Sequence, residues 1–391
     1  MFLEHQSKAQ KEYYIKLLSS AGAISRLFSE STEAYLDSRI AENLFCKAFE
    51  AENTSRKDNS IDARKGPIGI GIKTFLNKNG SSLQKIAEFN GDHSLYSTLP
   101  LKEKVKKIAE LRNNRIKTTT VVYGLEKIIY HCIVREAGKI LIYEQDCSPI
   151  NVKKIRNIKY SPKGSSITFS DLTNEYSFNL SKSTLYKRFK TENVSIKISI
   201  RMMEDPIVQI EKLVNEAGPI FTPVKKQPHV FLPLYSMKGG QHVPVSSGLN
   251  QWNANGRKRK PDEVYIPVPA WIHKKFKGFF PLSKDIVFEL TLPDRTIMKA
   301  SMCQQGLKAL MSNPNTALGK WILRDVLNLK EKELVDYKKL QSIGLDTVVV
   351  YKVDKDTYDI DFASIGSYEK FLSENGENGN GDETIIGDDE D

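Results

Sequence analysis

Two side chains near residue 70 have the types and spacing needed for metal-assisted hydrolysis of a phosphodiester. Asp62 precedes the run Gly-Ile-Gly-Ile, and Lys73 follows that run directly. A carboxylate can hold Mg²⁺, which polarises a phosphate and lowers the pKa of an attacking water, and a lysine can position that water. Because side chains alternate along a strand, Lys73 would share one face with Gly69 and Gly71 while isoleucines bury the other.

A second carboxylate is expected two residues before the lysine, but that position is Gly71. Glu42, on the helix expected before the hairpin, is the first candidate to replace it. Glu88, on the following strand, is the second, and Gln84 and Asp58 are weaker. We therefore expect Asp62, Lys73, Glu42 and Glu88 as the catalytic set, with Asp62 and Glu42 binding Mg²⁺. Ordinary roles remain open for the same side chains: a turn cap, an edge-strand lysine and solvated glutamates.

The first half of the chain has the pattern of a mixed α and β domain. Apolar spacing predicts helices at 8–28, 31–49 and 101–115, and strands at 68–75 and 83–89. Residues 150–200 alternate short β-like runs with lysine-rich turns, which we expect to follow phosphates. This order favours an α+β or α/β fold.

The second half changes character after a proline-rich segment. Short apolar runs separated by turns predict an all-β barrel or pseudobarrel with helical insertions. We therefore expect four parts. These are a nuclease-like domain at 1–205, a linker at 206–227, a barrel at 228–366 and an acidic, disordered tail at 367–391.

Charge indicates a polyanionic partner. The net charge is +10, yet the last 21 residues carry eight acids and no Lys or Arg, which leaves +18 on the preceding 370 residues. Such a basic body favours nucleic acid. The sequence has no run of eighteen apolar residues and no apolar signal-peptide core, and its four cysteines are widely spaced. We expect a cytoplasmic protein with no membrane contact and no small-molecule cofactor.

Two polar loops in the second half are candidates for contacting DNA. They span 246–261 and 303–321. Asn and Gln can pair bidentately with adenine and Arg with guanine, while lysines hold phosphates. The candidate DNA-binding residues are Ser247, Asn250, Gln251, Trp252, Asn253, Arg257, Lys258, Arg259, Gln304, Gln305, Lys308, Ser312, Asn313, Asn315 and Lys320.

The ordered motifs of residues 228–366 resemble the plant-B3-like DNA-recognition domain of type II restriction endonucleases of the NgoFVII and BfiI type. They include SGLNQWN, GRKRKPDEVYIPVP and CQQGLKALMSNPNTALGKW. The resemblance implies an open seven-stranded pseudobarrel that grips the major groove with two arms. By position, these arms would be Ser247–Arg259 and Gln304–Lys320.

The resemblance leaves the type of nuclease open. A phospholipase-D-like nuclease needs H-x-K, and only His273 has a lysine two residues later, inside the expected barrel. An H-N-H nuclease lacks histidines at suitable spacing. The remaining option is a PD-(D/E)XK-like core, whose β-hairpin carries acids and a lysine.

The predicted function is Mg²⁺-dependent, sequence-specific cleavage of both DNA strands by a type II restriction endonuclease. One active site per chain calls for two chains, so a homodimer is expected. Two alternatives stay open: a non-catalytic, sequence-specific DNA-binding protein, and a modification-dependent endonuclease.

Overall fold

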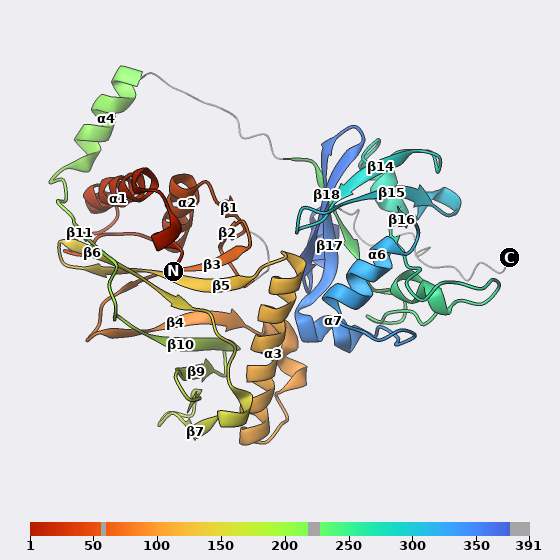
Figure 1. Cartoon of the computed structure of the whole chain (residues 1–391), viewed down its shortest axis with the longest axis horizontal. Helices are drawn as coiled ribbons and strands as arrows, with labels where there is room; N and C mark the ends of the chain where they lie inside the picture. The colour runs from red at the N-terminus through yellow and green to blue at the C-terminus, as the bar shows by residue number, and fades with distance from the viewer. Residues whose placement is uncertain (56–59, 218–226, 376–391) are drawn as a thin grey trace. The chain divides into compact units, whose positions relative to one another are not determined.

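A computed structural model describes residues 1–55, 60–217 and 227–375 (Figure 1). The chain divides into two compact units. The N-terminal unit consists of Met1–Thr120 and Leu125–Val224, and the C-terminal unit consists of Val121–Gly124 and Lys225–Asp391. No helix among the described residues is long and apolar enough to cross a membrane.

A mixed six-stranded sheet forms the centre of the N-terminal unit. Its strand order is β1-β2-β3-β5-β6-β11, and β3 and β5 are parallel while the other neighbours are antiparallel. The strands are β1 (Glu52–Asn53), β2 (Ala63–Lys65), β3 (Ile68–Leu76), β5 (Lys127–Glu136), β6 (Lys139–Asp146) and β11 (Ile196–Ser199).

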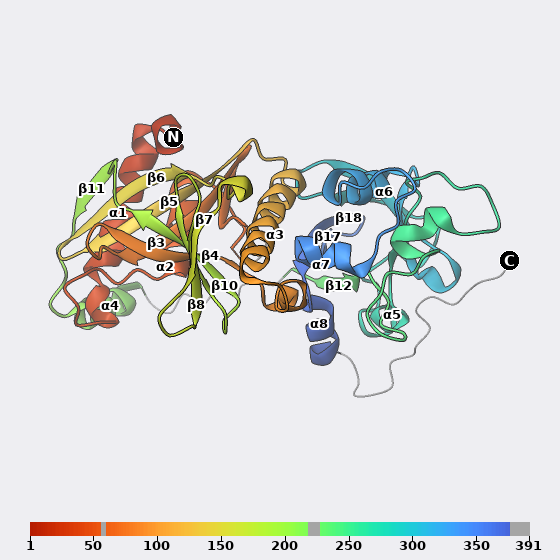
Figure 2. The same cartoon turned by 90° about the horizontal axis from the view of Figure 1, so that it is seen from below.

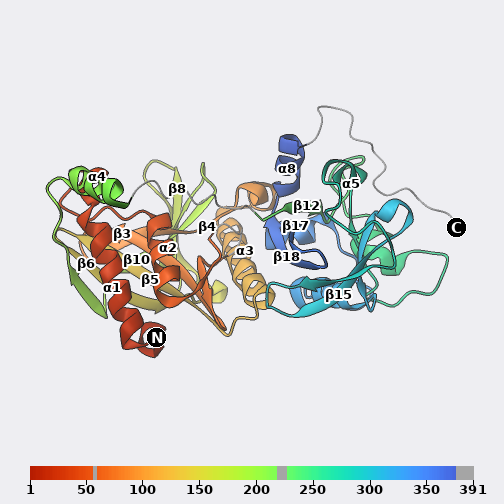
Figure 3. The ribbon, with the colours of Figure 1, turned by 90° about the horizontal axis from the view of Figure 1, so that it is seen from above.

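Two helices cover one face of this sheet: α1 (Lys8–Ala23) and α2 (Ser38–Phe49) (Figure 3). Alternate side chains of β3, Ile70 and Ile72, pack with both helices in one apolar core. The other side chains of β3 therefore point to the opposite face, which is the arrangement that the alternation in the sequence predicts.

A five-stranded antiparallel sheet completes the N-terminal unit, with strand order β4-β10-β9-β8-β7. Helix α3 (Leu101–Val122) packs on its inner face in a second apolar core. The strands are β4 (Ser81–Glu88), β7 (Arg156–Tyr160), β8 (Ser166–Ser170), β9 (Glu175–Asn179) and β10 (Thr184–Lys190). The short 3-10 helices of this unit are η1 (Leu3–His5), η2 (Ser25–Leu27), η3 (Asn90–Leu95) and η4 (Val152–Lys154).

The C-terminal unit is a nearly closed barrel of seven strands, which confirms the predicted pseudobarrel. The strand order is β12-β17-β18-β14-β15-β16-β13, and the outermost strands β12 and β13 approach each other. The strands are β12 (His229–Pro233), β13 (Ile266–Pro267), β14 (Val287–Thr291), β15 (Ile297–Cys303), β16 (Ala309–Asn313), β17 (Leu345–Asp354) and β18 (Thr357–Ser364). The helices are η5 (Gly248–Asn253), α5 (Ala270–Lys275), η6 (Gln305–Leu307), α6 (Ala317–Gly319), the π-helix η7 (Lys320–Val326), α7 (Tyr337–Ile343) and α8 (Ser367–Asn375).

Two segments differ from the sequence-based expectation. The expected linker contains helix α4 (Pro206–Ala217), while 218–226 lie outside the described residues. The expectation of disorder from residue 367 is wrong for α8, because Tyr368 and Phe371 are buried. Phe371 packs on Phe231 and Phe276, so these aromatic contacts hold the helix in place. The rest of the expected tail, 376–391, lies outside the described residues.

A buried carboxyl makes the stability of the C-terminal unit depend on pH. Burial raises the pKa of Asp346 from 3.8 to about 6, against hydrogen bonds from Thr347 and Tyr337 that lower it. The folded unit therefore holds this proton more tightly than the unfolded chain does. Stability is highest below about pH 4 for this group and is lost as the pH rises through about 6.

We expect the Asp346→Asn variant to lose this dependence. The expected loss in wild type is on the order of 3 kcal/mol between pH 4 and 7, since each pKa unit corresponds to about 1.4 kcal/mol. Urea unfolding followed by tryptophan fluorescence measures it, because all three tryptophans, Trp252, Trp271 and Trp321, belong to this unit. The exposed Asp354→Asn variant is the control and should keep the wild-type slope. An unchanged slope in Asp346→Asn contradicts the assignment.

Candidate functional site

The β2–β3 hairpin brings Asp62 and Lys73 together. The Lys73 ammonium lies 3.4 Å from Asp62 Oδ2 and 3.2 Å from the carbonyl oxygen of Ile72. The amide of Ile72 donates to the same Asp62 oxygen at 2.7 Å, and the amide of Asp62 donates to the carbonyl of Ile70 at 2.8 Å. The backbone of β3 therefore fixes the carboxylate, and both side chains are only about a fifth to a quarter exposed.

Glu42 projects from α2 into the same region. Its side chain is 7% exposed, and Arg39 Nη1 lies 3.2 Å from its Oε2. Burial raises the pKa of Glu42 above 4.5, and the charge of Asp62 raises it further, while Ser55 and Arg39 lower it. The structure thus places the first-ranked replacement acid within electrostatic reach of Asp62.

A third acid that the sequence analysis did not consider, Glu52, lies in the same neighbourhood. The pKa of the Cys46 thiol is raised to about 12, first by burial and then by the charges of Glu42, Asp62 and Glu52. Glu52 is on β1, opposite Arg64 of β2. Its signal in the sequence was its place between the end of the helix and the hairpin.

The space that the expected carboxylate would use is filled by Tyr130 of β5. A Cβ atom added to Gly71 would lie 3.0 Å from Cδ1 of the Tyr130 ring. Lys73 Nζ lies 5.9 Å from the centre of that ring and Lys187 Nζ lies 5.4 Å from it, and both distances are typical of cation–π contacts. Arg112 Nη2 donates to the Tyr130 hydroxyl at 2.8 Å. The Tyr130 ring, in contact with cations, therefore occupies the space beside residue 71 where a carboxylate was expected.

The other acidic candidates are placed differently. Glu88 ends β4 in the five-stranded sheet, where its carboxylate accepts from Lys85 and Asn90. Among the described residues, we find no contact between Glu88 and either Asp62 or Lys73. Asp58 lies outside the described residues. Glu42 is therefore the better-supported partner of Asp62.

The side chains at this hairpin fit Mg²⁺ better than a metal ion whose ligands all come from the protein. In the parts of the chain that the structure describes, no three His, Cys, Asp or Glu side chains are grouped to hold a metal ion. Two carboxylates, Asp62 and Glu42, are near enough that the negative charge of Asp62 raises the pKa of Glu42. Mg²⁺ typically binds through one or two carboxylates, with water and substrate phosphate as its other ligands. The residues present fit that mode.

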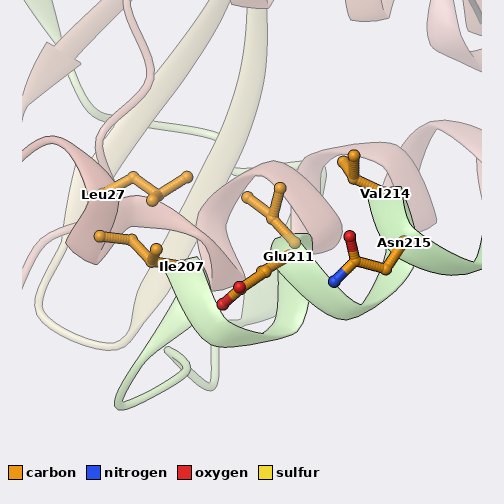
Figure 4. Close-up of a pocket in the computed structure, with 6 residues that line it drawn as sticks. Leu27, Ile207, Glu211, Val214 and Asn215 are labelled. Atoms are coloured by element: carbon orange, nitrogen blue, oxygen red, sulfur yellow. The ribbon is translucent and has the colours of Figure 1, made fainter. Parts of the chain in front are cut away.

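A hollow beside α4 offers no comparable chemistry (Figure 4). It has a volume of about 260 Å³ and lies between α4 and η2. Its lining is mainly apolar, with Leu27, Ile207 and Val214 facing the space and Glu211 and Asn215 at the side. This lining has one titratable group, Glu211, so the hollow lacks an acid–base or metal-binding set.

In the first arm, the structure separates positioning residues from exposed ones. Asn250 is fully buried, and its amide donates to the carbonyls of Pro244 (2.8 Å) and Val335 (2.9 Å). Its oxygen accepts from the Val335 amide at 2.9 Å. Arg259 donates to the carbonyl of Ala254 at 2.8 Å and is 14% exposed. Asn250 therefore does not reach the surface, and Arg259 shapes the loop.

The remaining side chains of the first arm are exposed or half-buried. Asn253, Arg257 and Lys258 are exposed, and Arg257 pairs with the buried Glu263. Ser247, Gln251 and Trp252 are half-buried.

The second arm has the same division. Ser312 is buried, and its hydroxyl donates to the Pro314 carbonyl and accepts from the Leu318 amide, each at 2.8 Å. Gln304, Gln305, Asn313 and Lys320 are exposed, and Lys308 and Asn315 are half-buried.

The bases of the two arms are locked together. A Cβ atom at Gly319 would lie 1.9 Å from the carbonyl oxygen of Asp262, so only glycine allows this approach. Arg324 Nε donates to Asp262 Oδ1 at 2.6 Å, and Arg324 Nη2 donates to the Pro261 carbonyl at 3.0 Å. These contacts join the C-terminal ends of the two loops.

The two asparagines of the first arm should differ in their effect on stability. Asn250→Ala removes the partner of the two buried backbone groups of Val335 and of the half-buried Pro244 carbonyl, and each buried group left unpaired costs roughly 1–3 kcal/mol. We expect the C-terminal unit to lose about 3 kcal/mol or more, measured by urea unfolding with tryptophan fluorescence. Asn253→Ala, at an exposed position, is the matched control and should change stability by less than about 0.5 kcal/mol. Equal effects would contradict this division.

Comparison with known proteins agrees with the fold of the C-terminal unit. Residues 225–354 match the family of the NgoFVII C-terminal B3-like DNA-binding domain. No curated protein matches the chain. The matched residues cover most of the seven-stranded barrel and both arms, and the family is one of DNA-binding domains from restriction enzymes. The seven-stranded barrel of the C-terminal unit therefore fits a B3-like domain, which points to sequence-specific DNA binding.

Proposed function

We propose that this protein is a type II restriction endonuclease, a Mg²⁺-dependent enzyme that cleaves both strands of DNA at a specific sequence. The observation that carries the proposal is the Asp62–Lys73 pair on the β2–β3 hairpin, in a chain whose other unit matches a B3-like domain of NgoFVII. The order of elements supports it further. A helix with a glutamate precedes a hairpin with an aspartate and a lysine, which is the order expected for a PD-(D/E)XK-like core whose second acid comes from the helix.

The side chains at the hairpin have complementary tasks in hydrolysis. Asp62 and Glu42 would bind Mg²⁺, which when bound supplies charge neutralisation at the phosphate and a more acidic water. Lys73, held near Asp62, lies where a cation can orient a nucleophilic water and stabilise the charge that develops on the phosphate. The Ile72 amide orients the Asp62 carboxylate through its hydrogen bond.

DNA reading would fall to the exposed residues of the two arms. Asn253 and Arg257 can pair with base edges, and Lys258 and Lys320 can hold phosphates. Cleavage of both strands with one such hairpin per chain calls for two chains on the DNA, so we propose a homodimer.

One observation favours a second candidate function, a sequence-specific DNA-binding protein without catalysis. The ring of Tyr130 occupies the place of the second acid, so the site depends on Glu42 for its other carboxylate. Incubation with long duplex DNA separates the two functions. A nuclease of the proposed kind gives discrete fragments with Mg²⁺ and none with EDTA, whereas a binding protein leaves the DNA intact in both.

Substitutions at the hairpin test the site itself. We expect Asp62→Ala and Lys73→Ala to reduce the cleavage rate by at least ~10²-fold, because each removes charge stabilisation from the reacting phosphate. DNA affinity, measured by fluorescence anisotropy, should stay near wild type. Glu88→Ala, in the other sheet, is the matched acidic control and should cleave normally. Normal cleavage by Asp62→Ala or Lys73→Ala refutes the site.

The acidic limb of the cleavage pH profile tests Glu42. Only its ionised form binds Mg²⁺, so cleavage falls as the pH drops through the raised pKa of Glu42. Arg39 lowers that pKa, and Arg39→Ala should therefore shift the acidic limb to higher pH while rates above pH 8 stay similar. The control is Lys47→Ala, an exposed cation on the same helix. A limb that does not move in Arg39→Ala excludes Glu42 as the titrating ligand.

A further inference from the structure

The edge of the five-stranded sheet carries a concentration of cations that the arms and the hairpin do not use. Between residues 150 and 201 the chain has eleven Lys or Arg and three Asp or Glu. Five of these cations are exposed and lie on or beside edge strand β7, and we call them the β7 ridge. The ridge consists of Lys153, Lys154, Arg156, Lys159 and Lys163.

The charge of the ridge is not neutralised within the protein. We find no ion pair for any of the five cations among the residues that the structure describes. The two acids that flank the ridge in sequence are engaged elsewhere. Asp146 pairs with Lys127. Asp171 accepts hydrogen bonds from the amides of Asn151, Thr173 and Asn174. Burial raises the pKa of Asp171, but those hydrogen bonds lower it further than burial raises it. The carboxylate therefore stabilises the adjoining turn. The ridge therefore presents an unpaired positive surface.

Strand register extends the ridge across the outer face of the sheet. Arg156 is opposite Ser170, which is opposite Glu175. Lys159 is opposite Thr168, which is opposite Ser177. Figure 2 shows β4, β7, β8 and β10, which belong to this sheet. The side chains of these two rows alternate with the core residues and so point away from α3.

The same residues line a hollow of about 390 Å³ on this face. Its lining includes Arg156, Lys159 and Arg188, together with the hydroxyls of Thr168, Ser170 and Ser177. Arg188 pairs with Glu175 at 2.8 Å, which leaves Arg156 and Lys159 as the cations available to a ligand. Cations flanked by hydroxyl donors are the groups that contact DNA phosphates.

We propose that the β7 ridge is a second DNA-contact surface, through which the N-terminal unit holds the phosphate backbone independently of base sequence. This inference rests on DNA as the ligand of the chain, as in the proposed function. Edge lysines also prevent strands from pairing between molecules. That role does not account for cations and hydroxyls that together line a hollow.

Salt dependence of binding tests the proposal. The logarithm of affinity falls with the logarithm of salt concentration with a slope of about 0.9 per phosphate contacted. In the full-length protein, Arg156→Ala/Lys159→Ala should reduce the slope by about 2 on a random-sequence duplex of roughly 30 base pairs, and weaken binding at moderate salt by about tenfold or more. Fluorescence anisotropy at several salt concentrations gives both quantities.

Matched variants make each outcome decisive. Lys8→Ala/Lys16→Ala removes the same charge from exposed positions on α1 and should keep the wild-type slope. Arg156→Lys/Lys159→Arg keeps the charge and should also keep it, which controls for damage to the fold. The proposal is overturned if Arg156→Ala/Lys159→Ala keeps the wild-type slope. It is also overturned if the α1 variant reduces the slope by the same amount as Arg156→Ala/Lys159→Ala. If the ridge variant shows no change in slope, the wild-type protein can still cleave DNA with Mg²⁺, so the two proposals fail separately.

Discussion

The candidate catalytic site depends on one constraint, the hydrogen bond from the Ile72 amide to the Asp62 carboxylate. Because that amide belongs to β3, the register of the hairpin fixes where the carboxylate lies. Lys73 is the next residue along the same strand, so it meets the same oxygen without a further element. The parallel pairing of β3 with β5 and the packing of α2 then hold the hairpin between two layers. The register of the β2–β3 hairpin therefore determines the positions of both Asp62 and Lys73.

Sequence patterns predicted the parts of the structure that follow from alternation. The isoleucines of β3 face the helices and Lys73 faces away, because successive side chains of a strand point to opposite faces of the sheet. A barrel was also predictable from the short apolar runs, and its seven strands were implied by the resemblance to the B3-like domains. Helix α2 begins at Ser38 after the Asp37 cap, later than the start at residue 31 that the sequence predicted. Local capping patterns occur at several positions, and tertiary packing selects among them.

Long-range contacts determined what the sequence could not reveal. Asn250 and Ser312 have the side chains of DNA-contacting residues, yet the barrel uses both for internal hydrogen bonds. The disorder expected from residue 367 followed from an acidic, glycine-rich composition. It missed two aromatic side chains, Tyr368 and Phe371, whose partners lie far away in the sequence. In each case the residue type was informative, but its role depended on a partner distant along the chain.

The contact between Gly71 and Tyr130 links two positions that no motif would connect. A carboxylate introduced at residue 71 would crowd the Tyr130 ring, because its Cβ atom would lie 3.0 Å from Cδ1 of that ring and the ring would have to shift. Its effect would depend on which side chain residue 130 carries. The two positions are therefore coupled, because a side chain at residue 71 and the ring at residue 130 compete for the same space.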